Sequence, residues 1–213
     1  MNDAIDGAGH LPATAPARVG IVGGSFNPAH SGHLHISQLA LDILALDAVW
    51  WLVSPQNPLK ASTDMGPLQG RVAEARALAA PEPRIFVSDM ERLLGTRYSV
   101  DTLNALLERY PGTRWVWIMG ADNLSEVHRW KDWTRLFELV PVAVFDRPSY
   151  SFQALQGPAA RQFQQHRVSR GDASALADLT PPAWMFLWSS FDPASATAIR
   201  DAQGPTKATQ TRE

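Results

Sequence analysis

The chain has 213 residues, of which 45% are apolar and 19% are charged, and its formal net charge is -2. These values are typical of a globular protein and exclude general disorder. The balanced charge without a Lys/Arg run argues against a nucleic-acid partner, and the absence of cysteine excludes disulfides, thiolate metal sites and a catalytic thiol. No apolar run approaches the length of a membrane span, so we expect no membrane partner and a cytoplasmic location.

The length indicates one domain between two short tails. We expect residues 1–17 and 203–213 to be flexible tails and residues 18–202 to form a single domain. The first tail carries two aspartates and lacks the basic and hydrophobic regions of a secretory signal. A homo-oligomer is possible, and the sequence leaves the oligomeric state open.

Short apolar runs alternate with segments of helical spacing along this domain. The runs predict buried strands at 19–22, 48–53, 84–87, 115–119, 140–145 and 184–188. The segments between them predict helices at 34–46, 69–79, 99–109, 122–139 in two pieces, and 152–165. The alternation predicts a doubly wound α/β fold, in which a mostly parallel sheet has helices on both faces. Ligands in such folds lie beyond the carboxyl ends of the strands.

The first predicted strand leads into GGSFNPAHSGH, residues 23–33, at the start of a helix. Gly23 and Gly24 permit a sharp turn and a close approach to a ligand, and free N–H groups at a helix start attract phosphate. His30 and His33 are three residues apart, so one helical turn can aim both imidazoles the same way, with Gly32 leaving room between them. Each ring can then donate to phosphate oxygens in a transition state. The alternative is a glycine-rich turn whose histidines only cap a helix.

The complete string resembles the signature of the nucleotidylyltransferase superfamily, whose members share a Rossmann-like fold and a His-x-Gly-His motif. The resemblance implies that His30 and His33 are catalytic. It also implies ATP contacts from Gly23, Gly24, Ser25, Phe26, His30, Gly32 and His33. Class I aminoacyl-tRNA synthetases carry a similar motif, but they are generally longer and need a tRNA-binding region.

A second motif, SATAIR at residues 195–200, resembles the Ser-x-Thr-x-x-Arg motif of the same superfamily. Ser195 and Thr197 would present hydroxyl and N–H groups at a helix start, and Arg200 would supply a catalytic cation for the β- and γ-phosphates. The two motifs would thus hold opposite ends of one triphosphate. Taken alone, this segment would be a helix N-cap followed by a surface arginine.

The middle of the chain narrows the choice of substrate. The string IMGADNL, residues 118–124, followed by Trp130, resembles nicotinate-nucleotide adenylyltransferases. Further matches in order are SPQNPLK at 54–60, Glu91 with Arg92, Tyr98-Ser99 with Thr102-Leu103, and DRP at 146–148. The resemblance spans roughly residues 20–200. Phosphopantetheine adenylyltransferases and glycerol-phosphate cytidylyltransferases share the first motif but resemble this middle section poorly.

A pyridine mononucleotide presents a flat ring, a ribose and a phosphate, so its site needs a stacking surface and polar or cationic donors. The resemblance implies mononucleotide contacts from Ser25, Asn27, Lys60, Tyr98, Ser99 and Trp130. Trp130 would stack on the pyridine ring, backbone N–H groups at the Tyr98 loop would meet the nicotinate carboxylate, and Lys60 would meet a phosphate. Gly120 and Asp122 would contact ATP, with Asp122 accepting from ribose hydroxyls. The alternatives are a core tryptophan, a helix-capping aspartate and a solvated lysine.

The family reaction is an in-line attack by the phosphate of nicotinic acid mononucleotide on the α-phosphorus of ATP, in NAD biosynthesis. The protein must position two anions and stabilise the transition state, without a covalent intermediate. Mg2+ would arrive with ATP, so we expect no metal ligand from the protein. Two alternatives stay open: a nicotinamide mononucleotide or other small-phosphate acceptor, and a nucleotide-binding module without catalysis.

Overall fold

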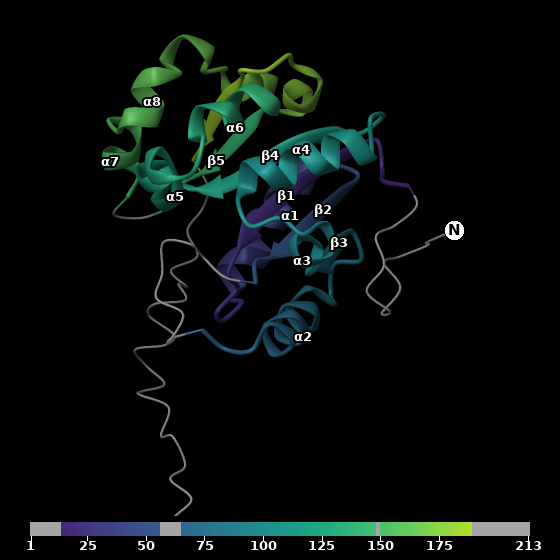
Figure 1. The fold of residues 1–213 in the computed structure, drawn as a ribbon. Coiled ribbons are helices and arrows are strands. Elements are labelled where there is room, and N and C mark those ends of the chain that lie inside the picture. Colours follow the sequence, from purple (N-terminus) through teal and green to yellow (C-terminus); the bar gives the residue numbers. More distant parts are fainter. Residues whose placement is uncertain (1–13, 56–64, 148–149, 189–213) are drawn as a thin grey trace, which may run out of the picture.

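The computed structural model describes residues 14–55, 65–147 and 150–188, which build a six-stranded sheet with helices around it (Figure 1). The strands are β1 (Arg18–Gly24), β2 (Ala48–Val53), β3 (Ile85–Ser88), β4 (Arg114–Gly120), β5 (Val142–Phe145) and β6 (Trp184–Leu187). Neighbouring strands are parallel throughout, in the order β3-β2-β1-β4-β5-β6. This is the order of a Rossmann-like doubly wound sheet, so the predicted fold class is confirmed.

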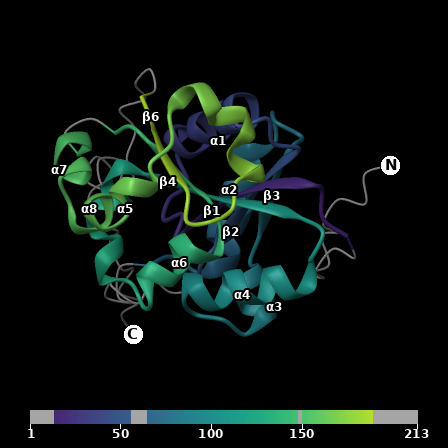
Figure 2. The ribbon, with the colours of Figure 1, turned by 90° about the horizontal axis from the view of Figure 1, so that it is seen from above.

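Helices cover both faces of the sheet. The α-helices are α1 (Ser31–Ile43), α2 (Leu68–Ala79), α3 (Met90–Leu94), α4 (Ser99–Arg109), α5 (Ala121–Glu126), α6 (Trp133–Leu139), α7 (Ser151–Leu155) and α8 (Pro158–Gln162). The 3₁₀ segments are η2 (Val127–Arg129), η3 (Gln164–His166) and η4 (Arg170–Asp178). Figure 2 shows α1 on one side of the sheet and α3, α4 and α6 on the other.

Side chains of the strands alternate between two apolar cores, one on each face. In β2, Trp50 and Leu52 belong to the core that contains α4 and α6, whereas Val49 and Trp51 belong to the core that contains α1 and α2. Successive side chains of a strand point to opposite faces, so an unbroken apolar run such as AVWWLV supplies both cores.

Most predicted elements match the observed ones to within one or two residues at each end, and three differences have a clear local reason. The single helix predicted over residues 152–165 is wrong, because Gly157 and Pro158 end α7 and open α8, and a 3₁₀ turn follows. The strand predicted from residue 140 begins at Val142, after Pro141, which cannot donate to a sheet ladder. Helix α1 begins and ends three residues before the predicted bounds, since the apolar pattern marks its buried face and not its ends.

The direction in which successive strands are added reverses at the centre of the sheet, between β1 and β4. From β1 the chain continues through α1 to β2, and from β4 it continues through α5 to β5, on the opposite side. The loops that follow β1 and β4 therefore separate at the carboxyl edge, where such folds bind ligands.

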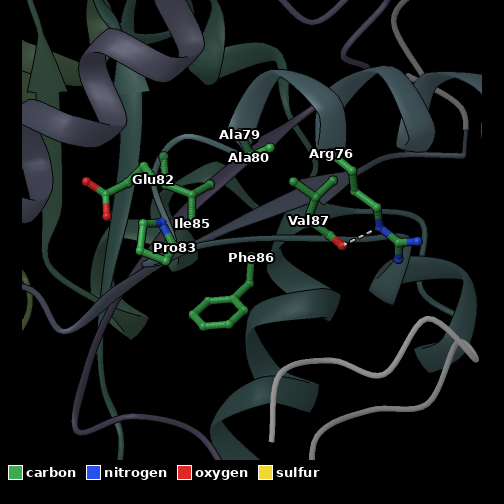
Figure 3. A pocket seen from close by; sticks show the side chains of 8 residues that line it. All are labelled: Arg76, Ala79, Ala80, Glu82, Pro83, Ile85, Phe86 and Val87. Carbon is green, nitrogen blue, oxygen red and sulfur yellow. Dashed lines mark hydrogen bonds between the residues drawn. The ribbon is translucent and has the colours of Figure 1, made fainter. Parts of the chain in front are cut away.

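A hollow lies at the outer edge of β3, two strands away from this reversal of the strand order (Figure 3). It is lined by Arg76, Ala79, Ala80, Glu82, Pro83, Ile85, Phe86 and Val87. Arg76 Nε donates to the carbonyl oxygen of Val87 at 3.3 Å, which covers part of an exposed sheet edge. Within the three described ranges, no helix has the length and apolar character of a membrane span.

Candidate active site

The loop after β1 is shaped by tight packing beneath it. A Cβ at Gly23 would lie 2.7 Å from the ring of Trp117, so only glycine fits over this tryptophan. The backbone then turns at Phe26, whose φ of 45° is in the left-handed region. The Phe26 side chain is buried and stacks on Trp51 at a centroid distance of 5.2 Å. Phe26 therefore anchors the loop from below, and only its backbone is left to contact a ligand.

The structure brings the two motif histidines together at the start of α1. Their ring centroids lie 3.8 Å apart, and the backbone N–H of His30 donates to Nδ1 of His33 at 3.2 Å. Because Nδ1 of His33 accepts, the proton of its neutral ring is on Nε2. Burial, together with smaller contributions from the nearby charges of His30 and Arg147, lowers the pKa of His33 to about 3. His33 is therefore a neutral imidazole at physiological pH and can donate through Nε2.

Arg147, which follows β5, adds a cation to this edge of the sheet. It forms an ion pair with Asp122 in the first turn of α5, and both side chains are only about one-third exposed. A Cβ at Gly120 would collide with the Asp122 carboxylate, so the glycine makes room for the pair. One oxygen of Asp122 is thus taken by Arg147, and a ribose hydroxyl would have to use the other. The DRP match in the sequence contained Arg147, but sequence reasoning did not assign it to the site.

A buried arginine joins the loops behind the site. Arg71 of α2 is 3% exposed. Its guanidinium donates to four backbone carbonyl oxygens, those of Ser25, Ser54 (2.8 Å), Pro55 (3.1 Å) and Gly66 (2.9 Å). The Gly66 N–H donates in turn to the Asn27 side chain at 3.2 Å. Two residues of the predicted mononucleotide set, Ser25 and Asn27, are therefore connected to Arg71.

The matched pair Glu91 and Arg92 separates in the structure. Glu91 is 4% exposed, the Ser54 hydroxyl donates to its carboxyl group, and burial raises the pKa of Glu91 to about 7. Arg92 points outward and donates to Asp89 at 2.6 Å. Glu91 is therefore a partly protonated carboxyl near neutral pH, linked to the loop after β2 through Ser54.

The two segments predicted to bind the pyridine ring lie side by side. Trp130 is half-buried, and its ring meets Trp117 edge-on at a centroid distance of 6.3 Å. Tyr98 and Ser99 form the N-terminal end of α4. Lys131, next to Trp130, donates to Asp101 of α4 and lies over the Tyr98 ring. Because Trp117 also lies under Gly23, a single tryptophan ring separates Trp130 from the loop that follows β1.

The remaining predicted site residues, Lys60, Ser195, Thr197 and Arg200, lie outside the described residues. The boundaries of the two tails and of the domain stay predictions, as do the cytoplasmic location and the homo-oligomer. In the part of the chain that the structure describes, no group of three or more His, Cys, Asp or Glu side chains is arranged to hold a metal ion.

A family model described as cytidylyltransferase-like matches residues 21–202, a range that includes strands β2 to β6 in full, the end of β1 and both histidines of the loop. The chain therefore belongs to the cytidylyltransferase-like family of nucleotidyltransferases.

Curated relatives narrow the assignment within this family. A protein of Caulobacter sp. (strain K31) is 50% identical over 87% of this chain and 98% of its own length. A protein of Bradyrhizobium sp. (strain ORS 278) is 49% identical over 89% of this chain and 98% of its own. Both are named probable nicotinate-nucleotide adenylyltransferase. The resemblance to nicotinate-nucleotide adenylyltransferases seen in the motifs is thereby confirmed.

Solved structures agree with this fold. Plasmodium falciparum nicotinic acid mononucleotide adenylyltransferase, complexed with NaAD, is similar with a TM-score of 0.65 and 13% identity. The match covers 87% of this chain and 83% of that one. At this identity the likeness shows a common fold.

Proposed function

We infer that this chain transfers the adenylyl group of ATP to nicotinic acid mononucleotide, giving nicotinic acid adenine dinucleotide and pyrophosphate. The main support for this function is the identity of about 50% to proteins named probable nicotinate-nucleotide adenylyltransferase. The similar segment includes the His30–His33 pair and Trp130. The order of the motifs along the chain supports the same reaction.

In this reaction the mononucleotide phosphate attacks the α-phosphorus of ATP, the bond from that phosphorus to the bridging oxygen breaks, and pyrophosphate leaves. The attacking phosphate is already ionised, so the protein needs no base. We propose that His33 donates its Nε2–H to an α-phosphate oxygen as charge grows there. His30 lies beside it to hold the same phosphates, and the ion pair of Arg147 with Asp122 lies near the same edge.

The other proposed ATP contacts extend from this centre. Gly24, Ser25 and Gly32 belong to the loop and the first helical turn, where backbone N–H groups can meet phosphate oxygens. We propose that Ser195, Thr197 and Arg200 hold the far phosphates. We place Mg2+ on the oxygens of the triphosphate, because the Asp122 carboxylate at this edge already pairs with Arg147.

The acceptor face is proposed from the neighbouring segments. Trp130 would stack on the pyridine ring, and the N–H groups at Tyr98 and Ser99 would receive the nicotinate carboxylate. Asn27 would contact the mononucleotide near the loop that follows β1, and Lys60 would add a cation.

Pyrophosphate release from ATP tests this function directly. We expect release with nicotinic acid mononucleotide and much slower release with nicotinamide mononucleotide or phosphopantetheine. A faster rate with nicotinamide mononucleotide would reassign the acceptor. Absence of release with every acceptor would instead support a nucleotide-binding module without catalysis.

Trp130→Ala should raise the KM for nicotinic acid mononucleotide about 10-fold, because stacking of a base on an aromatic side chain contributes about 1–3 kcal/mol. The KM for ATP should change little. Steady-state kinetics with each substrate varied in turn measure both constants. Phe152→Ala, which removes a highly exposed aromatic ring from α7, is the control and should change neither KM. An equal rise in both constants for Trp130→Ala would exclude the stacking role.

A further inference from the structure

A charged pair bridges the two segments of the proposed acceptor face. Lys131 Nζ lies 3.1 Å from each carboxylate oxygen of Asp101 and 4.9 Å from the centroid of the Tyr98 ring. The pair links the residue that follows Trp130 to the first turn of α4. Helices α4 and α6 lie side by side in this region (Figures 1 and 2).

Asp101 has two opposed effects at this position. It is the third residue of α4, and a carboxylate in the first turn stabilises a helix by interacting with the positive end of its dipole. The same helix end, at Tyr98 and Ser99, is where the acceptor carboxylate is proposed to bind. An uncompensated Asp101 would therefore repel an anionic pyridine substrate while stabilising the helix that has to receive it.

We propose that Lys131 is a specificity-determining residue, which neutralises Asp101 and so keeps the start of α4 open to the carboxylate of nicotinate. This inference rests on the proposed function. A neutral nicotinamide ring would gain nothing from the compensation, so the pair favours the acid over the amide.

Other charges near the pair are consistent with this role. The Arg97 guanidinium lies 5.9 Å from the centroid of the Tyr98 ring, on the residue before it, and adds positive charge. Asp132 follows Lys131 and adds one negative charge. The hydrogen bond from Lys131 to Asp101 raises the pKa of Lys131, so the ammonium stays charged at neutral pH. Both side chains of the pair are roughly 40% exposed, so salt should weaken their effect.

The test compares Lys131→Met, Asp101→Asn and the double variant. Lys131→Met should raise the KM and the calorimetric Kd for nicotinic acid mononucleotide about 3- to 10-fold, the scale of one partly screened charge at close range. The KM for ATP and the Kd for nicotinamide mononucleotide should stay at the wild-type value. Asp101→Asn alone should leave the affinity for nicotinic acid mononucleotide equal or tighter. Adding Asp101→Asn to Lys131→Met should restore that affinity, and the difference should shrink in about 0.5 M KCl.

The signs of these effects separate the proposal from a structural role. If the ion pair only held α4 against the Trp130 segment, each single variant would weaken binding and the double variant would not recover. That result would overturn the proposal, as would an unchanged ratio of acid to amide affinity in Lys131→Met. Arg135→Met breaks a comparable exposed pair with Glu138 in α6 and should change none of the constants. A wild-type enzyme that does not use nicotinic acid mononucleotide would contradict the proposed function itself.

Discussion

His33→Ala should lower kcat by about 10²-fold or more, the scale of losing one donor that acts in the transition state. The bond that Nδ1 accepts from the backbone N–H of His30 fixes the proton of His33 on Nε2, so this ring presents one defined donor. The KM values should change far less, because the contact strengthens only as charge grows on the transferring phosphate. Single-turnover measurement of pyrophosphate release separates this step from product release.

Two variants control this prediction. His33→Gln keeps an N–H donor and should retain part of the rate, while His128→Ala removes an exposed histidine of η2 and should have no effect. Circular dichroism should show an unchanged fold in His33→Ala. Near-normal turnover in that variant would exclude the proposed role.

The pH dependence of kcat follows from the same geometry. Because the pKa of His33 is about 3, the ring stays neutral between pH 8 and pH 5, and we expect His33 to cause no loss of rate across that range. A wild-type loss of activity centred near pH 6.5 that disappears in His33→Gln would show that the ring is instead protonated near its ordinary pKa.

Local patterns predicted much of the fold and the core of the site. The strand at 48–53 and the helix at 99–109 were predicted with their observed bounds, since each has a continuous periodicity that its packing preserves. The histidine pair could be predicted because three-residue spacing on a helix fixes the direction of both rings. The break at Gly157 was missed because the apolar spacing continues across it.

Contacts between distant residues could not be predicted in this way. Arg71 and the carbonyl of Ser25 are 46 positions apart, and Lys131 and Asp101 are 30 apart. A lone arginine on α2 or a lone lysine before α6 resembles any solvated cation in the sequence. The neutral state of His33 also depends on burial between Phe26, His30 and Trp51, which only the folded chain creates.

Arg71→Met should lower the free energy of unfolding by about 3 kcal/mol, because the variant leaves buried carbonyl oxygens without a donor. Methionine fills much of the space of the arginine side chain, so the lost stability comes from the missing hydrogen bonds more than from a cavity. Turnover should fall as well, since Ser25 and, through Gly66, Asn27 lose the group that holds their loop. Urea unfolding and steady-state kinetics measure the two effects.

Arg76→Met provides a matched control, because Arg76 lies on the same helix as Arg71, within two turns of it. Arg76 is exposed and donates a single hydrogen bond, to Val87, so its loss should cost no more than about 0.5 kcal/mol and leave turnover unchanged. Arg71→Lys keeps the charge, but an ammonium lacks the planar, forked guanidinium that donates to several carbonyl oxygens at once. We therefore expect Arg71→Lys to be more stable than Arg71→Met but less stable than the wild type. If Arg71→Lys restored both stability and rate, charge alone would explain the role of Arg71. We expect Arg71→Lys to restore neither property fully, because the guanidinium nitrogens of Arg71 donate to carbonyl oxygens from three separate stretches of backbone at once.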